Sequence, residues 1–463
     1  MVQANTPSPR ESTTLLDGTR PRQLHPAHTW ALDTRLFAHL TPHGNTNWTF
    51  PNFILLAVFW VWSECSTLTR AFGHASGLCQ SLLGTVVFQS YTGFAAALKT
   101  WTPTLIPLMW GCLHQLMTQV AGPHGRIGRW WPLAVDGSRA TTPRTRKNEK
   151  AFCTPRYGRG TRAKSRAKWK NKKRRSKKLS QPVHPQIWLT LLWHLGLKMP
   201  WSWKCGPSTA SERHHFAAML ATQEFPENTL FCGDAGFVGY DLWHAMIDRG
   251  HHFLIRVGGN VRLLRGLGTV QQHGDLVHFW PNAVAAKKEP PLALRLLTFR
   301  VGKCEVHAVT NVLSERQLSV AQAVRLYRAR WGVEVQFRSL KQTFGRSKLH
   351  SRTPELAEAE LEWSLLGLWL ILLLTVSEQI PAGIGPERSS VSVAIQVFRD
   401  AMSHRGARGL KQELCDAVKD EYHRRAPKGA RYRPQSKDKP AAGPPQVVTA
   451  TAEQRRKYKQ VMG

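Results

Sequence analysis

The sequence predicts an α/β protein: a buried sheet flanked by helices, preceded by a helical region and interrupted by a β-rich segment. Two apolar runs of strand type each end at an aspartate, Asp136 in one and Asp234 in the other, as expected of strands inside a sheet. An amphipathic helix fits residues 327–341, and residues 258–314 alternate in short segments separated by Gly, Asn and Pro, which is typical of β structure.

The composition points to a polyanionic partner. The chain has 463 residues, and its 64 Lys and Arg against 30 Asp and Glu give a formal net charge of +34. This length is enough for two or three domains with a substantial core. A charge of this size favours nucleic acid over an anionic membrane.

Cysteines and apolar runs indicate the compartment. The eight cysteines are scattered without a CxxC pair or a zinc-type cluster, so we expect reduced thiols. The apolar runs 53–62 and 363–376 are shorter than the roughly 20 residues of a membrane span, and we expect buried core helices there. Residues 1–14 lack the basic-then-apolar pattern of a secretory signal. These observations predict a cytoplasmic protein without membrane contact.

The N-terminal part divides into two regions. Residues 1–45 are rich in Pro, Thr, Ser and His and predict a loose leader. Residues 46–125 are apolar and predict a helical domain that is interrupted at Pro103 and Pro107. Such a domain either recognises DNA or only packs against its neighbours, and the sequence leaves both interpretations open.

The first aspartate lies in RWWPLAVDGSR, residues 129–139. An apolar run before an Asp-Gly turn places Asp136 at the end of a buried strand, although Asp-Gly beside a strand is more often turn chemistry alone. Residues 144–180 follow, rich in Lys and Arg, with Glu149 as the one acid. They predict a disordered basic loop that contacts nucleic acid, but a targeting signal or a solvated loop has a similar composition.

The patterns that follow predict further elements. We expect a strand at residues 187–197, a helix at 208–222, a strand ending at Asp234, a helix at 241–249, a strand at 252–257 and helices at 353–380 and 392–404. In the β-rich insertion, Trp280 either belongs to the core or stacks on a DNA base. Residues 406–463 predict a basic, largely disordered tail.

The helix at residues 327–341, YRARWGVEVQFRSLK, carries one polar face. At about 100° per residue, its polar members fall within a wedge of roughly 60°. They are Tyr327, Arg330, Glu334 and Lys341. A carboxylate flanked by two cations and a phenol suits a metal-bound phosphodiester. An amphipathic helix with a solvated charged face has the same pattern.

Three acids, Asp136, Asp234 and Glu334, lie about one hundred residues apart in the chain. If they converge, they repel one another unless a cation lies between them, and Mg²⁺ or Mn²⁺ is the natural partner of oxygen ligands. Two such ions activate an attacking water or 3′-hydroxyl and stabilise the leaving oxygen. The sequence alone does not prove the convergence.

These motifs resemble the DDE transposases of bacterial insertion sequences, in the group with the Y-R-E-K signature. The resemblance rests on DGS at residues 136–138, DAGF at 234–237 and the pattern Tyr327-x2-Arg330-x3-Glu334-x6-Lys341. It covers roughly residues 125–375, including PRTRKNEKAF after the first Asp. The four-residue signature is specific, whereas the two Asp motifs alone are not. The long basic tract, residues 156–178, departs from the family pattern.

The resemblance implies a ribonuclease H-like core, a mixed sheet flanked by helices, built from residues 126–257 and 315–405. The β-rich insertion, residues 258–314, would precede the catalytic Glu helix. By this similarity Asp136, Asp234 and Glu334 are catalytic metal ligands for Mg²⁺, with Mn²⁺ as a substitute and two ions expected. Tyr327, Arg330 and Lys341 would grip DNA phosphates.

The implied reaction is cut-and-paste DNA transposition, with metal-dependent nicking at the ends of the element, hairpin release and strand transfer. The partners would be double-stranded transposon ends and target DNA, held by a homodimer in a synaptic complex at the nucleoid. Two other functions fit the same sequence. A ribonuclease H-like nuclease would cut without joining, which the Y-R-E-K helix argues against. An inactive DNA-binding derivative fits the basic decoration, although the acids are intact.

Deletion of residues 156–178 is expected to weaken DNA binding and to flatten its salt dependence, because each phosphate contact releases counterions. Binding constants measured over a series of salt concentrations test this. An unchanged slope of log K against log salt would show that the tract does not contact DNA.

Overall fold

The structure is a computed structural model that describes residues 37–42, 44, 46–153, 184–267, 275–302, 304–403, 408–419 and 443–462. Most of the expected leader and residues 154–180 of the basic loop expected at 144–180 lie outside these residues. The beginning of that loop was predicted wrongly, because Arg146–Phe152 form a helix that Thr145 caps.

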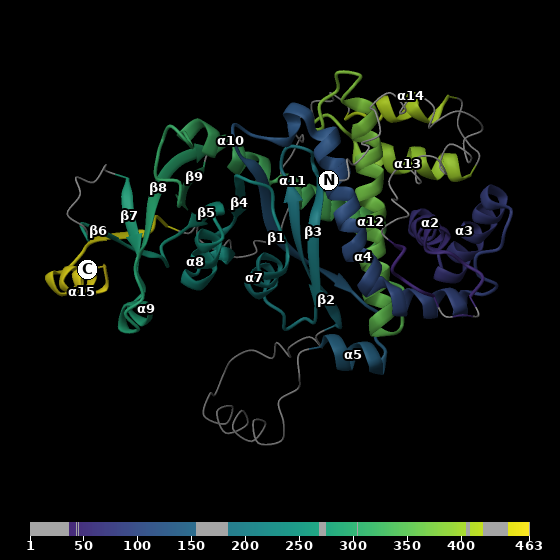
Figure 1. The fold of residues 1–463 in the computed structure, drawn as a ribbon, viewed down its shortest axis with the longest axis horizontal. Helices are drawn as coiled ribbons and strands as arrows, with labels where there is room; N and C mark the ends of the chain where they lie inside the picture. The colour runs from purple at the N-terminus through teal and green to yellow at the C-terminus, as the bar shows by residue number, and fades with distance from the viewer. Residues whose placement is uncertain are drawn as a thin grey trace, which may run out of the picture.

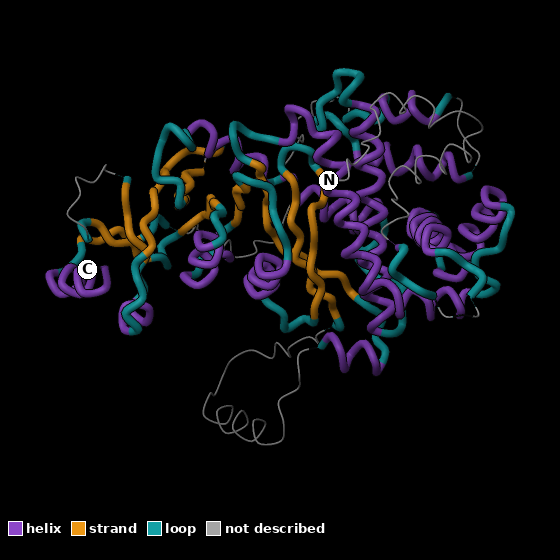
Figure 2. The backbone as a smooth tube through the Cα atoms, viewed as in Figure 1, coloured by secondary structure: helices purple, strands orange, loops and turns teal. Residues whose placement is uncertain are grey.

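A ten-stranded mixed sheet runs through the described part of the molecule, in the order β10-β6-β7-β8-β9-β5-β4-β1-β2-β3 (Figures 1 and 2). Its strands are β1 (Trp131–Thr141), β2 (Gln186–His194), β3 (Met199–Gly206), β4 (Thr229–Gly233), β5 (His252–Val257), β6 (Arg262–Arg265), β7 (Leu276–Phe279), β8 (Leu292–Val301), β9 (Cys304–Thr310) and β10 (Gln446–Thr449).

The strand directions identify the core. Strands β1, β2 and β3 form an antiparallel meander, while β4 and β5 run parallel to β1 on its other side. The order β3-β2-β1-β4-β5 with these directions is that of a ribonuclease H-like sheet, so the predicted fold class is confirmed. Strand β9 then pairs antiparallel with β5. The β-rich insertion therefore extends the same sheet instead of forming a separate one.

Helices cover both ends of this sheet (Figure 1). The N-terminal region contains α2 (Phe50–Trp62), α3 (Leu68–Leu83), α4 (Tyr91–Ala121) and the 3-10 turn η3 (Gly122–Gly125). The middle of the chain adds α5 (Arg146–Phe152), α7 (Glu212–Thr222), η4 (Ala235–Phe237), α8 (Tyr240–Asp248) and α9 (Asn282–Ala286). The remaining helices are α10 (Val320–Arg330), α11 (Gly332–Arg338), η5 (Ser339–Thr343), α12 (Pro354–Gln379), α13 (Val391–Met402), α14 (Leu410–Cys415) and α15 (Ala452–Met462).

Helix α12 is the central buried helix. It packs against α2, α4, α13, α14 and β3. Its length and composition would allow it to cross a membrane, but 94% of its most apolar window is buried inside the protein. Close approach is possible at Gly367, where the indole Nε1 of Trp62 donates to the glycine carbonyl at 2.9 Å. Both apolar runs of the sequence are thus core helices, as expected.

Two elements that contain proline, α4 and β3, differ from the sequence-based prediction. Helix α4 is not interrupted but runs through Pro103 and Pro107. Both rings lie on its solvent face, so the backbone carbonyls that lose a helical partner lie on that face too. Strand β3 was not predicted, and its Pro200 has no N–H to donate to a ladder. It is tolerated because β3 is an edge strand and pairs across an irregularity at Leu192 and Trp193.

Part of the C-terminal tail is ordered, contrary to expectation. Within residues 406–463, expected to be largely disordered, β10 pairs with β6 and α15 follows it. Val447 and Val448 supply the strand signal that the basic composition obscured.

Trp280 is only 5% exposed and its Nε1 donates to the carbonyl of Glu289, so it belongs to the core. All eight cysteines lie among the described residues and none forms a disulfide, as expected.

A buried carboxylate fixes the segment that follows η5. Glu360 of α12 is fully buried and accepts hydrogen bonds from the backbone N–H groups of His350 and Ser351 and from the Ser351 hydroxyl. The Arg346 guanidinium lies 3.7 Å from its Oε1. This buried pair is retained because every partner is satisfied.

Replacing Glu360 with Ala is expected to lower the free energy of unfolding by about 3 to 5 kcal/mol, because it leaves the Arg346 charge buried without compensation. Urea unfolding of the full chain measures this. The exposed Glu355 in the first turn of the same helix is the control, and Glu355→Ala should cost at most about 1 kcal/mol. Equal losses in both variants would contradict the assignment.

Candidate active site

The first two acids meet because of the register between β1 and β4. Strand β1 pairs with β4 only as far as Ala134, opposite Cys232, but continues beside β2 to Thr141. Asp136 therefore lies within β1, and the prediction that it ends a strand is wrong. The reason is that β2 goes on pairing with β1 after β4 has ended. Extended by two residues, the same register places Asp136 opposite Asp234, the residue after β4.

Each aspartate is oriented by its own backbone. Asp136 Oδ1 accepts from the N–H of Gly137 at 2.8 Å, and Asp234 Oδ1 accepts from the N–H of Gly236 at 2.8 Å. The second bond makes Asp234 the cap of η4. Among the described residues no hydrogen bond engages the second oxygen of either carboxylate. That oxygen is the one available to a ligand.

The third acid lies on a broken helix. Instead of one helix over residues 327–341, the chain forms α10, turns at Trp331, continues as α11 and widens into the π-turn η5. Gly332 lies at the break, and a Cβ built on it would lie 3.3 Å from the indole Nε1 of Trp193. The close contact with β2 therefore explains why glycine stands there. Glu334 projects from the first turn of α11.

The break rearranges the predicted polar face. Tyr327 is 4% exposed and packs edge-on against Phe299. The Arg330 guanidinium lies 5.5 Å from the Tyr327 ring centre and 3.9 Å from Glu334 Oε1. The structure thus brings three of the four signature residues together, with Tyr327 and Arg330 buried rather than solvated.

Lys341 is the fourth signature residue and lies apart. It is half-buried in η5, and burial lowers the pKa of its ammonium group. In the described part of the chain, no hydrogen bond or ion pair connects its side chain to the other three. The predicted wedge fails here because a count of 100° per residue does not hold across a turn and a π-helical segment.

The electrostatics show that the acids act on one another. Burial raises the pKa of Asp136 to about 6, the Gly137 hydrogen bond and Arg330 oppose this, and the charges of Asp234 and Glu334 add to it. Carboxylates separated by about one hundred residues in sequence therefore share one electrostatic environment.

A fourth acid, Glu212, lies at the same place and was missed by the sequence reasoning. It is the first residue of α7, and its carboxylate occupies the space where a Cβ of Gly137 would be. Burial and then the charges of Asp136 and Asp234 raise its pKa to about 7, while Arg139 opposes this. An acid in the first turn of a helix usually only stabilises the helix N-terminus, so the pattern did not mark Glu212 as a site residue. Because β3, the strand before α7, was not predicted, the position of α7 beside the aspartates could not be predicted either.

The donor chemistry of the site suits a hard divalent cation. The available atoms are carboxylate oxygens, which Mg²⁺ and Mn²⁺ prefer, and burial first and the neighbouring negative charges second raise the pKa values of Asp136 and Glu212. Across the residues that the structure describes, no three His, Cys, Asp or Glu side chains lie close enough together to hold a metal ion. The carboxylates are thus of the chemical kind that binds the ion, but in this open arrangement they are spaced more widely than the ligands of one ion.

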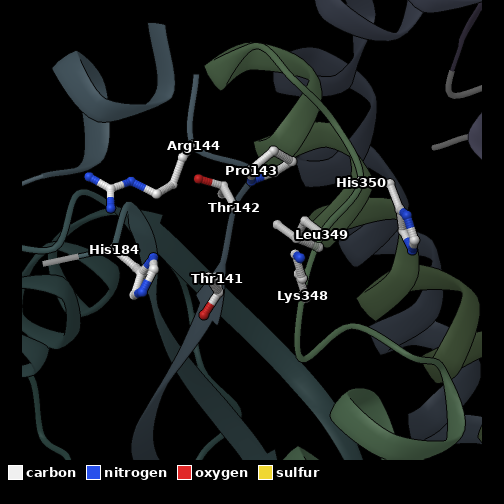
Figure 3. A pocket seen from close by; sticks show the side chains of 8 residues that line it. All are labelled: Thr141, Thr142, Pro143, Arg144, His184, Lys348, Leu349 and His350. Carbon is white, nitrogen blue, oxygen red and sulfur yellow. The ribbon is translucent and has the colours of Figure 1, made fainter. Parts of the chain in front are cut away.

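A basic pocket lies at the far end of β1 (Figure 3). Its volume is about 680 Å³, and Thr141 and Lys348 on its two sides are joined by a parallel β-bridge. Its lining residues are Thr141, Thr142, Pro143, Arg144, His184, Lys348, Leu349 and His350. Four of these carry basic groups and none is acidic, which favours an anion.

Glu212→Gln should stabilise the metal-free protein at pH 8 by about 1 to 2 kcal/mol and have little effect at pH 4.5. The folded-state pKa of about 7 lies above the value of 4.5 that a Glu side chain ordinarily has. The folded state therefore binds the extra proton, and wild-type stability falls as pH rises between these values. Urea unfolding in EDTA at both pH values tests this. An equal difference at pH 4.5 and pH 8 would contradict it.

Comparisons with known proteins cover the same residues. A family model for the transposase DDE domain matches residues 131–370, a span that begins with β1, ends in α12 and contains Asp136, Asp234 and Glu334. The transposase InsG for insertion sequence element IS4 of Escherichia coli (strain K12) is 30% identical over 302 residues, 62% of this chain and 62% of that protein. The chain thus spans less than two thirds of that relative.

Among solved structures, the cryo-EM structure of the piggyBac transposase synaptic complex with hairpin DNA has a TM-score of 0.39 and 10% identity, covering 89% of this chain and 88% of that one. This similarity is too low to support an argument, and the fold assignment rests on strand order. The family model covers more than half of the chain and all three predicted acids. The chain therefore belongs to the DDE transposase domain family.

Proposed function

We propose that the protein carries out metal-dependent cut-and-paste transposition of an insertion sequence, with nicking at the ends of the element, hairpin release and strand transfer. The observation that carries the proposal is the pairing register that sets Asp136 opposite Asp234, with Glu334 close enough for its charge to act on Asp136. Family membership supplies the reaction class.

Asp136, Asp234 and Glu334 would hold two Mg²⁺ ions, or Mn²⁺ in their place. When bound, these ions activate the attacking oxygen and stabilise the leaving oxygen of a phosphodiester. The backbone hydrogen bonds to Oδ1 of each aspartate keep the carboxylates oriented. Glu334 is exposed at the start of a short helix, and a small movement of α11 toward the aspartates would close the open arrangement.

Arg330 is suited to bind a phosphate beside these acids. Its side chain is buried, its Nε has no hydrogen-bond partner among the described residues, and its guanidinium pairs with Glu334 only at 3.9 Å. A buried donor without a partner costs about 1 to 3 kcal/mol, and a phosphate oxygen would satisfy it. Tyr327 acts through Arg330, since its ring lies 5.5 Å from the guanidinium. Lys341 would reach the DNA backbone from η5.

Long-range charge would bring the DNA to this site. The net charge of +34 favours binding of double-stranded transposon ends and target DNA, and the basic pocket at the end of β1 offers a further anion contact. Joining two ends requires two active sites, so we propose a homodimer in the DNA-bound complex. The proposed location is the cytoplasm, at the nucleoid.

Asp136→Asn, Asp234→Asn and Glu334→Gln should each lower Mg²⁺-dependent cleavage of transposon-end DNA by on the order of 10³-fold or more, because each removes a ligand charge needed in the transition state. DNA affinity should change little, since the carboxylates do not attract phosphate. Cleavage, strand-transfer and filter-binding assays on the same samples measure this.

Asp241→Asn is the matched control, because Asp241 is an exposed acid in the first turn of α8 and outside the site. Wild-type cleavage by any of the three site variants would refute the assignment of that residue. Cleavage by the wild type without joining of 3′-hydroxyl ends would instead identify a nuclease.

A further inference from the structure

Glu212 reaches the acidic centre from the opposite face of the sheet. Residues that pair across β1 and β2 point to the same face, and successive residues alternate. Ala134 pairs with Trp193, which contacts Gly332 of α11, so Asp136 also lies on the α11 face. Gly137 pairs with Thr190, whose hydroxyl bonds to His215 of α7 at 3.0 Å, so Gly137 lies on the α7 face.

Gly137 leaves the space that Glu212 occupies, and Gly236 lies close to the same carboxylate. The Glu212 carboxylate occupies the space that a side chain at position 137 would take. In η4, a Cβ built on Gly236 would lie 2.9 Å from Asp234 Oδ1 and 3.8 Å, an ordinary van der Waals distance, from Glu212 Oε2. Two carboxylates thus approach one point beside η4. The glycine of the Asp-Gly motif does not make a turn here but leaves room for Glu212.

This carboxylate has no partner that explains its position. Within the described ranges, no group donates a hydrogen bond to Glu212 and no cation lies within ion-pair distance of it. Arg139 is the nearest source of positive charge that acts on it, but its guanidinium stacks on Trp188 at 4.1 Å. Stabilisation of a helix N-terminus requires only an exposed acid, whereas this one is half-buried beside two like charges, which raise its pKa.

We propose that Glu212 is a fourth carboxylate of the catalytic centre that binds a divalent cation, directly or through one water molecule, together with Asp136 and Asp234. The inference rests on the proposed metal-dependent function. Two divalent cations carry four positive charges, and four carboxylates balance them before the DNA phosphate arrives. Glu212 would complete the ion environment from the α7 face while Glu334 completes it from the α11 face.

Mn²⁺ binding to the full-length protein without DNA, followed by electron paramagnetic resonance of the free ion, tests this proposal. Glu212→Gln should weaken Mn²⁺ binding by about 10-fold or more. Asp241→Asn, which removes an exposed first-turn acid elsewhere, should bind Mn²⁺ like the wild type. Unchanged Mn²⁺ affinity in Glu212→Gln, with a large loss in Asp136→Asn, would overturn the role of Glu212 and leave the proposed function intact.

A second variant separates ion binding from folding. In Gly137→Ala the new methyl group displaces the Glu212 carboxylate without removing its charge, and the same loss of Mn²⁺ affinity is expected. Wild-type affinity in Gly137→Ala would count against the proposal even if Glu212→Gln failed to fold. If Asp136→Asn also binds Mn²⁺ like the wild type, the metal site itself is absent from this centre and both proposals fail.

Discussion

The arrangement of the site depends on the point at which the pairing between β1 and β4 stops. The two strands run parallel and share hydrogen bonds up to Ala134 and Cys232. Beyond that point β1 stays paired with β2, and among the described residues no strand pairs with its other edge from Val135 until the β-bridge between Thr141 and Lys348. Because parallel strands keep their register, Asp136 and Asp234, which lie two residues beyond the last pair, face each other across this opening.

The sheet uses both of its faces at this opening. Helix α11 covers one face and supplies Glu334, while α7 covers the other and supplies Glu212. Gly137 allows the approach of α7, because the Glu212 carboxylate fills the space of the missing Cβ, and a Cβ on Gly332 would lie 3.3 Å from the indole Nε1 of Trp193 under α11. The backbone thus gathers charges that would separate in a flexible chain, and burial together with the smaller effect of their repulsion raises the carboxyl pKa values of Asp136 and Glu212.

The sequence predicted the parts of the fold that rest on local patterns. The apolar runs predicted β4, β5 and the buried helices α2 and α12, and motif spacing predicted the family, while the roles of Asp136, Asp234 and Glu334 stay a prediction. Pairing between strands far apart in the chain could not be predicted from local patterns. The strand around Asp136 continues because β2 pairs with it, and β3 forms despite Pro200 because it lies at an edge. Glu212 looked like a helix-start acid, since only the tertiary fold brings Gly137 and Gly236 to it.

The central claim is that Asp136 and Asp234 share a divalent cation with Glu334 when DNA is bound. A crystal structure of the protein with transposon-end DNA and Mn²⁺, with anomalous scattering recorded at the manganese edge, tests it most directly. The account predicts an anomalous peak within bonding distance of both aspartates and of Glu334, with α11 moved toward the sheet. A peak elsewhere, or ligation that excludes either aspartate, would contradict it.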